Sequence, residues 1–122
     1  MILLNDLYSI VNRESTTGSV KATLFINTSH KIFDGHFPGL PVVPGVCMVQ
    51  MVRELLEVSE NKEFRIETAD NIKFLSVIDP RQHEKVSASI DYTQSDTVYT
   101  INATLFADQL IFLKLRATLR TV

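Results

Sequence analysis

Two features of this sequence are suited to chemistry, namely His36 and the start of a helix predicted at Gly45. Prolines and glycines crowd the residues between them, and proline removes an N–H donor and restricts the residue before it, so regular backbone is not expected before Gly45. The first N–H groups of a helix lack intrahelical acceptors and carry the positive end of its dipole, which suits them to hold a carbonyl oxygen that gains negative charge. A nearby imidazole is then a candidate base for a proton alpha to that carbonyl. Taken alone, a histidine before a proline-rich turn is more often a hydrogen-bonded structural residue than a catalyst.

The segment after Gly45 predicts an amphipathic helix. At 100° per residue one broad arc of this helix is apolar. It contains Cys47, Met48, Val49, Met51, Val52, Leu55, Leu56 and Val58. Gln50, Arg53, Glu54 and Glu57 fall on the opposite arc, which is most simply a solvated or interfacial face. Cys47 and the methionines are predicted to lie in the core.

The run His36-Phe37-Pro38-Gly39, then Pro41, then Pro44-Gly45, resembles the active-site signature of the 3-hydroxyacyl-acyl-carrier-protein dehydratases of bacterial fatty-acid synthesis. The resemblance implies a hot-dog fold, in which an antiparallel sheet wraps around one long central helix. It also implies that His36 is the catalytic base, that the Gly45 N–H binds the thioester carbonyl, and that the Val42 carbonyl orients His36. Phe37, Gly39 and Val46 belong to the substrate-binding segment that the same resemblance implies.

In the family that this signature resembles, an acidic residue of the central helix of the other subunit completes the site, and its position falls at Gln50. A carboxyl group can donate a proton, whereas an amide only forms hydrogen bonds. Family members often carry a glutamine one turn later, where this chain has Glu54, so acid and amide are exchanged. Residues four apart share a helix face, with Cβ atoms about 6 Å apart, so Glu54 is a candidate substitute for the acid. The alternative is that Glu54 faces water or pairs with Arg53.

Composition excludes several classes of protein. With 122 residues, of which 45% are hydrophobic, we expect a single domain over 1–122. The sequence has neither a long apolar span nor a basic flank at its start, which predicts a cytoplasmic protein without a membrane partner. One cysteine and three histidines do not form a metal cluster, and the net charge of −2 gives no reason to bind nucleic acid. No metal or other cofactor is expected.

The remaining segments predict one α+β domain with one helix of about 14 residues and five or six antiparallel strands. Residues 1–10 suggest one or two helical turns, and residues 12–18 a polar turn. The expected strands are 19–28, 64–68, 72–78 (buried on both sides), 86–92 (with one wet face), 97–107 and 110–121. Residues 93–96 are expected to form a turn, and residues 107–109 a hairpin. His30 and His83 match no motif and are predicted to lie on the surface.

The last expected strand carries Lys114, Arg116 and Arg120 on one face. This pattern suits a docking surface for an acidic carrier protein, whose phosphopantetheine arm would bring the acyl chain to the site. An ordinary wet strand face, or an edge protected by charge, is the alternative.

Together these features predict a dehydratase-like enzyme that removes water from 3-hydroxyacyl thioesters of acyl carrier protein. Its catalytic residues would be His36, Gln50 and Glu54, in a site shared within a homodimer or a higher oligomer. Two alternatives stay open. One is a hot-dog thioesterase that uses Glu54 as its base. The other is a catalytically weak accessory subunit that binds acyl carrier protein and pairs with an active paralogue.

Overall fold

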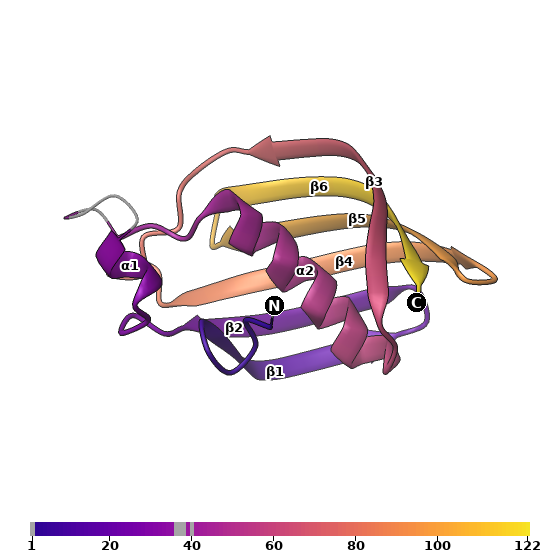
Figure 1. Cartoon of the computed structure of the whole chain (residues 1–122), viewed down its shortest axis with the longest axis horizontal. Coiled ribbons are helices and arrows are strands. Elements are labelled where there is room, and N and C mark those ends of the chain that lie inside the picture. The colour runs from indigo at the N-terminus through magenta and orange to yellow at the C-terminus, as the bar shows by residue number, and fades with distance from the viewer. Residues whose placement is uncertain (1, 36–38, 40) are drawn as a thin grey trace.

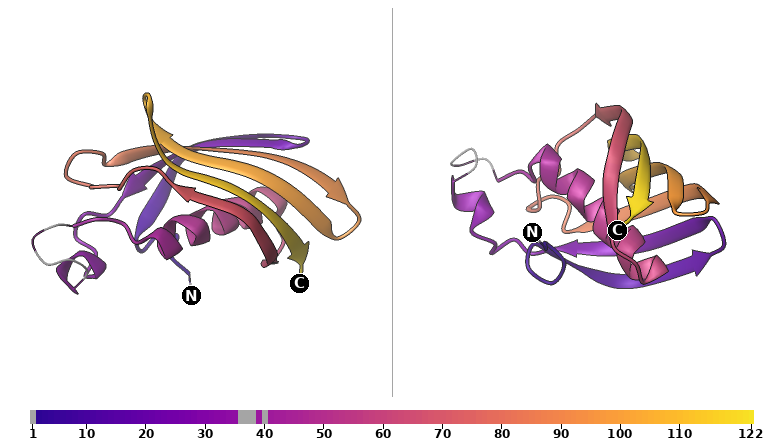
Figure 2. Two further views of the ribbon diagram at one scale, coloured as in Figure 1. Left: turned by 90° about the horizontal axis from the view of Figure 1, so that it is seen from above. Right: turned by 45° about the vertical axis from the view of Figure 1, so that its right-hand side comes forward.

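A six-stranded antiparallel sheet curves around one long helix in the computed structural model, which describes residues 2–35, 39 and 41–122 (Figures 1 and 2). The strand order across the sheet is β1-β2-β4-β5-β6-β3. The strands are β1 (Tyr8–Thr16), β2 (Ser19–Ile26), β3 (Phe64–Phe74), β4 (Lys85–Ser95), β5 (Val98–Ala107) and β6 (Leu110–Thr121). The helices are α1 (Ile32–Gly35) and α2 (Gly45–Glu60). The predicted α+β arrangement of a sheet around a central helix is therefore confirmed.

Helix α2 begins at Gly45, as the proline pattern predicts. Pro44 occupies the N-cap position in an extended conformation (φ −59°, ψ 145°), and no side chain of the described residues caps the helix there. At the other end Asn61 adopts the left-handed conformation, and its N–H donates to the Glu57 carbonyl. This residue type and conformation commonly end helices, because they satisfy carbonyls that the helix leaves without donors.

The core lies between α2 and the concave face of the sheet. Alternate residues of β2, β4 and β5 are buried, for example Val86, Ala88 and Ile90 on β4, while their neighbours are partly or fully exposed. The helix contributes its buried side chains to this core, namely Cys47, Met48, Met51, Val52, Leu55 and Leu56. The predicted strand with one wet face and the hairpin at Asp108 are confirmed.

The N-terminal predictions are wrong in type. Residues 5–7 form a turn rather than a helix, and a strand then runs through residues 8–16, where a polar turn was expected. Most of β1 is exposed because β1 is an edge strand that pairs with β2 alone among the described strands. A strand in that position needs few apolar residues, so its sequence lacks the usual signal.

The segment after α2 also differs from the prediction. A single strand β3 covers residues 64–74, with irregularities near Glu67 and Asp70, instead of two separate strands. Residues 72–77 are not a buried strand, since Ile72, Phe74, Leu75 and Val77 are 41–58% exposed. β3 is the second edge of the sheet. The turn expected at 93–96 is shorter, because β4 extends to Ser95.

Candidate functional site

The start of α2 faces a pocket of about 530 Å³. Its walls come from the residues before and within the first helical turn and from the end of β3. They include Val42, Gly45, Met48, Phe74, Leu75 and Val77. Nearly all of these side chains are apolar, so the pocket suits an acyl chain more than a charged ligand.

Backbone hydrogen bonds fix the approach to this helix. The Val43 N–H donates to the Ile78 carbonyl at 2.9 Å, and the Pro44 carbonyl accepts from the N–H groups of Cys47 and Met48 at 2.9 and 3.2 Å. The N–H groups of Gly45 and Val46 come earlier in the helix, where its own ladder offers no acceptor. Val46 is 71% exposed and Val42 is buried. Gly39 has a φ of +82°, which favours glycine. Of the predicted site residues, His36 and Phe37 lie outside the described residues.

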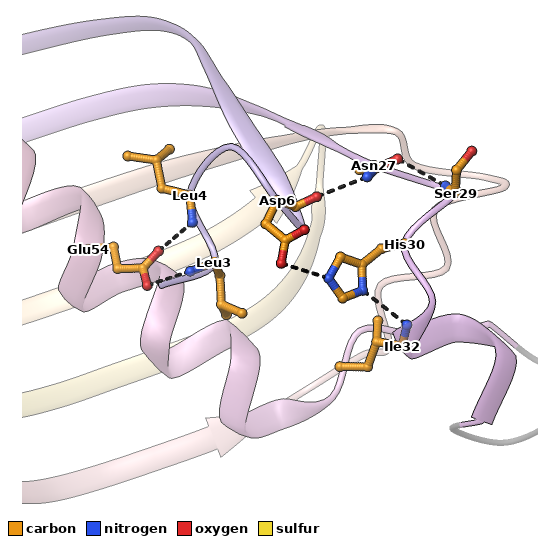
Figure 3. A network of polar contacts seen from close by, with 8 residues as sticks. All are labelled: Leu3, Leu4, Asp6, Asn27, Ser29, His30, Ile32 and Glu54. Atoms are coloured by element: carbon orange, nitrogen blue, oxygen red, sulfur yellow. Dashed lines mark hydrogen bonds and ion pairs between the residues drawn. The ribbon is translucent and has the colours of Figure 1, made fainter. Parts of the chain in front are cut away.

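Glu54 is buried in the middle of α2, with only 4% of its surface exposed. Its Oε2 accepts from the Leu3 N–H at 2.8 Å and from the Gln50 amide Nε2 at 2.7 Å. Its Oε1 accepts from the Leu4 N–H and from the Tyr8 hydroxyl, both at 2.9 Å. Figure 3 shows the carboxylate turned toward the chain at Leu3 and Leu4. The alternative in which Glu54 faces water or pairs with Arg53 is therefore wrong.

These contacts define what the two exchanged residues can do. Each carboxylate oxygen of Glu54 accepts two hydrogen bonds, so the group acts as an anchor for the N-terminal segment, residues 2–7 before β1. Because a carboxylate only accepts, the amide atom of Gln50 nearest to it must be the nitrogen. Burial and then the charge of Glu54 raise the pKa of Tyr8, which keeps its hydroxyl as a donor. Burial, with the Glu54 charge as a second cause, also raises the pKa of the Cys47 thiol.

A second group of contacts links the N-terminal segment to α1 (Figure 3). His30 Nε2 lies 3.1 Å from Asp6 Oδ2, while His30 Nδ1 accepts from the Ile32 N–H at 3.0 Å. The Asn27 side chain donates to the Asp6 carbonyl and accepts from the Ser29 N–H. The His30 side chain is only 14% exposed, and His83 packs edge-on against Phe112, so neither is the plain surface residue that was predicted.

The C-terminal end of α2 carries a third polar cluster. Glu60 accepts from the hydroxyls of Tyr99 at 2.8 Å and Tyr92 at 3.0 Å. Burial and then the hydrogen bond to Glu60 raise the pKa of Tyr99 to about 12. Far from the pocket, these groups hold the helix end against β4 and β5.

The three predicted docking cations do not form one free surface. Arg120 forms an ion pair with Glu67 and also donates to the Thr97 hydroxyl at 3.2 Å. Lys114 and Arg116 are exposed. Lys114 lies opposite Lys73 of the neighbouring strand β3. Lys73, which the sequence analysis did not identify, therefore joins Lys114 and Arg116 on the outer face of the sheet.

Within the described ranges, no three His, Cys, Asp or Glu side chains are placed to hold a metal ion. No described helix has the length and apolar character to cross a membrane.

The sheet wrapped around α2, with a pocket at the helix start, defines a protein of the hot-dog class, as predicted. Solved structures agree with this fold. The dehydratase heterocomplex ApeI:P from Xenorhabdus doucetiae aligns with a TM-score of 0.74 at 20% identity, over 91% of this chain and 96% of that one. A hypothetical thioesterase from Streptococcus pneumoniae TIGR4, solved with coenzyme A, aligns with a TM-score of 0.66 at 12% identity, over 94% and 85%.

Sequence comparison identifies the family. The family model described as ApeI-like, ApeI dehydratase, matches residues 12–109, and the chain belongs to this family of hot-dog dehydratases. It is 29% identical over 115 residues to the 3-hydroxyacyl-[acyl-carrier-protein] dehydratase FabZ of Rickettsia bellii (strain OSU 85-389), covering 88% of this chain and 76% of the relative. It is 30% identical over 103 residues to FabZ of Rickettsia africae (strain ESF-5), covering 78% and 68%.

Proposed function

We propose that this protein removes water from 3-hydroxyacyl thioesters carried by acyl carrier protein and releases the 2-enoyl thioester. The observation that carries the proposal is the family match over residues 12–109. The apolar pocket at Gly45 supports it, because that is where the family signature requires the thioester to bind.

In the proposed reaction, His36 takes the proton from the carbon alpha to the thioester carbonyl. The electron pair left on that carbon is stabilised as an enolate-like oxygen at the N–H of Gly45, where the helix dipole favours negative charge. The double bond then forms between the alpha and beta carbons as the bond from the beta carbon to its hydroxyl breaks. The hydroxyl needs one proton to leave as water.

Glu54 is a poor source for that proton, because both of its oxygens already accept hydrogen bonds from two donors each. Gln50 has no acidic proton. We therefore propose that His36 returns the proton it removed to the leaving hydroxyl, in an elimination with a single base. Glu54 would act as a positioning residue that holds the Gln50 amide, and Gln50 would orient the hydroxyl by hydrogen bonding. Lack of a placed acid typically costs 10²- to 10⁴-fold in rate.

We further propose a homodimer formed along β3, with one site shared between subunits. β3 is an edge strand, and Ile72, Phe74, Leu75 and Val77 at its end are exposed and apolar. A second copy could pair with this edge and cover those side chains. Light scattering at micromolar concentration tests this proposal, since an active monomer would rule out a shared site.

The acidic partner in this proposal is acyl carrier protein, docking near Lys114 and Arg116 with Lys73 in place of Arg120. Arg120 is engaged by Glu67, so its charge is already compensated. Charge reversal at Lys114 should weaken carrier binding and its dependence on salt, whereas Arg120→Gln should change both less. Equal effects of the two substitutions would contradict this surface.

A mass-spectrometric assay on 3-hydroxyacyl-carrier and acyl-carrier substrates tests the function. Loss of water that disappears in His36→Ala supports the dehydratase. Loss of the whole acyl chain indicates a thioesterase, and no change in either substrate indicates an accessory subunit. Equal dehydration by the wild type and His36→Ala would remove His36 from the mechanism.

One comparison favours a second candidate. The structural neighbour from Xenorhabdus doucetiae was solved as a dehydratase heterocomplex, so this chain is also a candidate subunit of a mixed dimer with a related dehydratase. Activity that appears only after a paralogue is added would support this candidate over the homodimer.

A further inference from the structure

The Phe74 ring lies directly against Gly45. A Cβ atom added to Gly45 would stand 2.8 Å from Phe74 Cζ and 2.9 Å from Cε1, well inside van der Waals contact. The ring therefore fills the space that a side chain at position 45 would occupy. Gly45 and Phe74 both line the same pocket.

Backbone contacts hold both sides of this contact in place. On one side, the N–H of Leu75, the residue after Phe74, donates to the Phe112 carbonyl at 2.9 Å, and Phe74 is in register with Leu113 of β6. On the other side, the Val43 N–H donates to the Ile78 carbonyl at 2.9 Å. These hydrogen bonds tie the backbone on both sides of the contact into the fold.

Phe74 contributes little to the core of the subunit, since 53% of its surface is exposed. Ile72 lies two residues earlier and so projects from the same face of β3, where it is 41% exposed, yet it does not line the pocket. An interface with a second copy would account for the exposure of both residues. It would not account for the contact of one ring with the helix start.

We propose that Phe74 determines substrate specificity by forming the wall beside the thioester carbonyl and its alpha carbon. This inference rests on the proposed function. With the carbonyl oxygen at the Gly45 N–H, the ring closes the space on one side of the alpha carbon. Thioesters with an unbranched alpha carbon fit beside the ring, whereas an alpha-methyl branch collides with it. A site of this kind distinguishes a methyl group by about 10- to 200-fold.

The test measures binding of two non-reactive amide analogues of 3-hydroxyacyl-pantetheine, one unbranched and one methylated at the alpha carbon. Calorimetry on the full chain gives the ratio of the two affinities in the wild type, in Phe74→Ala and in Ile72→Ala. We expect the wild type and Ile72→Ala to prefer the unbranched analogue at least tenfold, and Phe74→Ala to lose most of that preference. Phe74→Leu, which keeps an apolar side chain, provides a second variant should Phe74→Ala fail to fold.

The outcomes separate this inference from the proposed function. If the wild type binds and dehydrates the unbranched substrate but the ratio is the same in both Phe74 variants, Phe74 does not set specificity and only this inference fails. An equal loss of preference in Ile72→Ala would assign the effect to the β3 edge and would also overturn it. If neither analogue binds to the wild type and no substrate is dehydrated, the proposed function and this inference are both contradicted.

Discussion

Helix α2 begins in an open pocket and continues into closed polar networks. At its start, Val46 is 71% exposed, no described side chain caps the first turn, and the nearest ring is itself half exposed. About two and a half turns further on, Glu54 is almost fully buried and accepts four hydrogen bonds, and at the helix end Glu60 accepts two from tyrosines.

The two regions of α2 therefore have different roles: its start can bind a ligand, whereas its middle and end stabilise the fold. Donors and apolar surface that the chain leaves available at Gly45 can be used by a ligand. Glu54 has its acceptor capacity taken up by the protein, and removing it would leave buried donors without partners. Substitutions at the helix start should therefore alter activity more than stability, and substitutions in the middle should do the reverse.

Glu54→Ala should have the largest effect on stability, lowering the free energy of unfolding by about 4 kcal/mol. It leaves the Leu3 N–H and the Tyr8 hydroxyl buried without their acceptor and frees the N-terminal segment. Urea unfolding measures the loss. Glu57→Ala is the matched control on the same helix, since it removes one acceptor, that of the Phe64 N–H, and should cost about 1 kcal/mol. Equal losses in the two variants would show that Glu54 is not an anchor.

Gln50→Glu should raise dehydration about 10²-fold, the lower end of what a placed general acid gives. The new carboxyl would lie where the Gln50 amide now contacts Glu54 Oε2 at 2.7 Å, so the two carboxyls must share a proton. Their mutual repulsion raises the pKa of the pair, which keeps a proton available for the leaving hydroxyl.

The same pair makes the stability of Gln50→Glu depend on pH. A carboxyl whose pKa is raised in the folded state contributes its stability below the unfolded value of about 4.3, and that contribution is lost as the pH rises through the folded value. The variant should lose stability relative to the wild type as pH increases above about 4.3. Gln50→Met, which cannot donate a proton, is the control. An equal rate in both variants would exclude an acid at this position.

Helix α2 also shows which features can be predicted from local sequence and which cannot. Proline spacing and apolar periodicity predict the start and the buried arc of α2, because both depend on neighbouring residues. Glu54 has a local signal as well: it follows Cys47 by seven residues, so two helical turns place it at the border between its predicted polar arc and the apolar arc rather than at the centre of the polar one. Its partners could not be predicted, because Leu3, Leu4 and Tyr8 lie about fifty positions away in the chain and two of them donate through the backbone.

Edge strands account for most of the errors in the predicted fold. β1 carries mainly polar residues and β3 carries exposed apolar ones, and neither follows the alternation of a half-buried strand. Position in the sheet, which depends on the whole topology, decides their pattern. The signature predicts Gly45 in the site, but the contact between Gly45 and Phe74 requires the end of β3 to return to the helix start, which no local pattern shows.

Gly45→Ala should lower dehydration about tenfold while changing the free energy of unfolding by less than about 1 kcal/mol. The added Cβ would push the Phe74 ring, whose contacting atoms are the far end of an exposed side chain, into the space of the substrate. Steady-state kinetics and urea unfolding measure the two effects. In the double variant with Phe74→Ala the clash is absent, so the effects of the two substitutions on rate should not add. A large loss of stability in Gly45→Ala alone would contradict the contrast between the two halves of the helix.

Tyr99→Phe should have the smallest effect, lowering the free energy of unfolding by about 1 kcal/mol at pH 8, because it removes the hydrogen bond to Glu60 at the C-terminal end of α2. The pKa of Tyr99 is raised to about 12 by burial and then by that hydrogen bond. For an acid with a raised folded pKa, the contribution to stability is complete below the unfolded value of about 10 and is lost as the pH rises through about 12. The wild type should therefore lose stability over this interval, and Tyr99→Phe should lose less.

Urea unfolding at pH 8 and pH 11, with tyrosinate absorbance to follow the titration, measures both changes. Tyr92→Phe is the control, since Tyr92 donates to the same carboxylate from a partly exposed position and should affect the alkaline loss less. If wild type and Tyr99→Phe lost stability equally between pH 8 and 11, the Glu60 cluster would not be what holds this end of the helix.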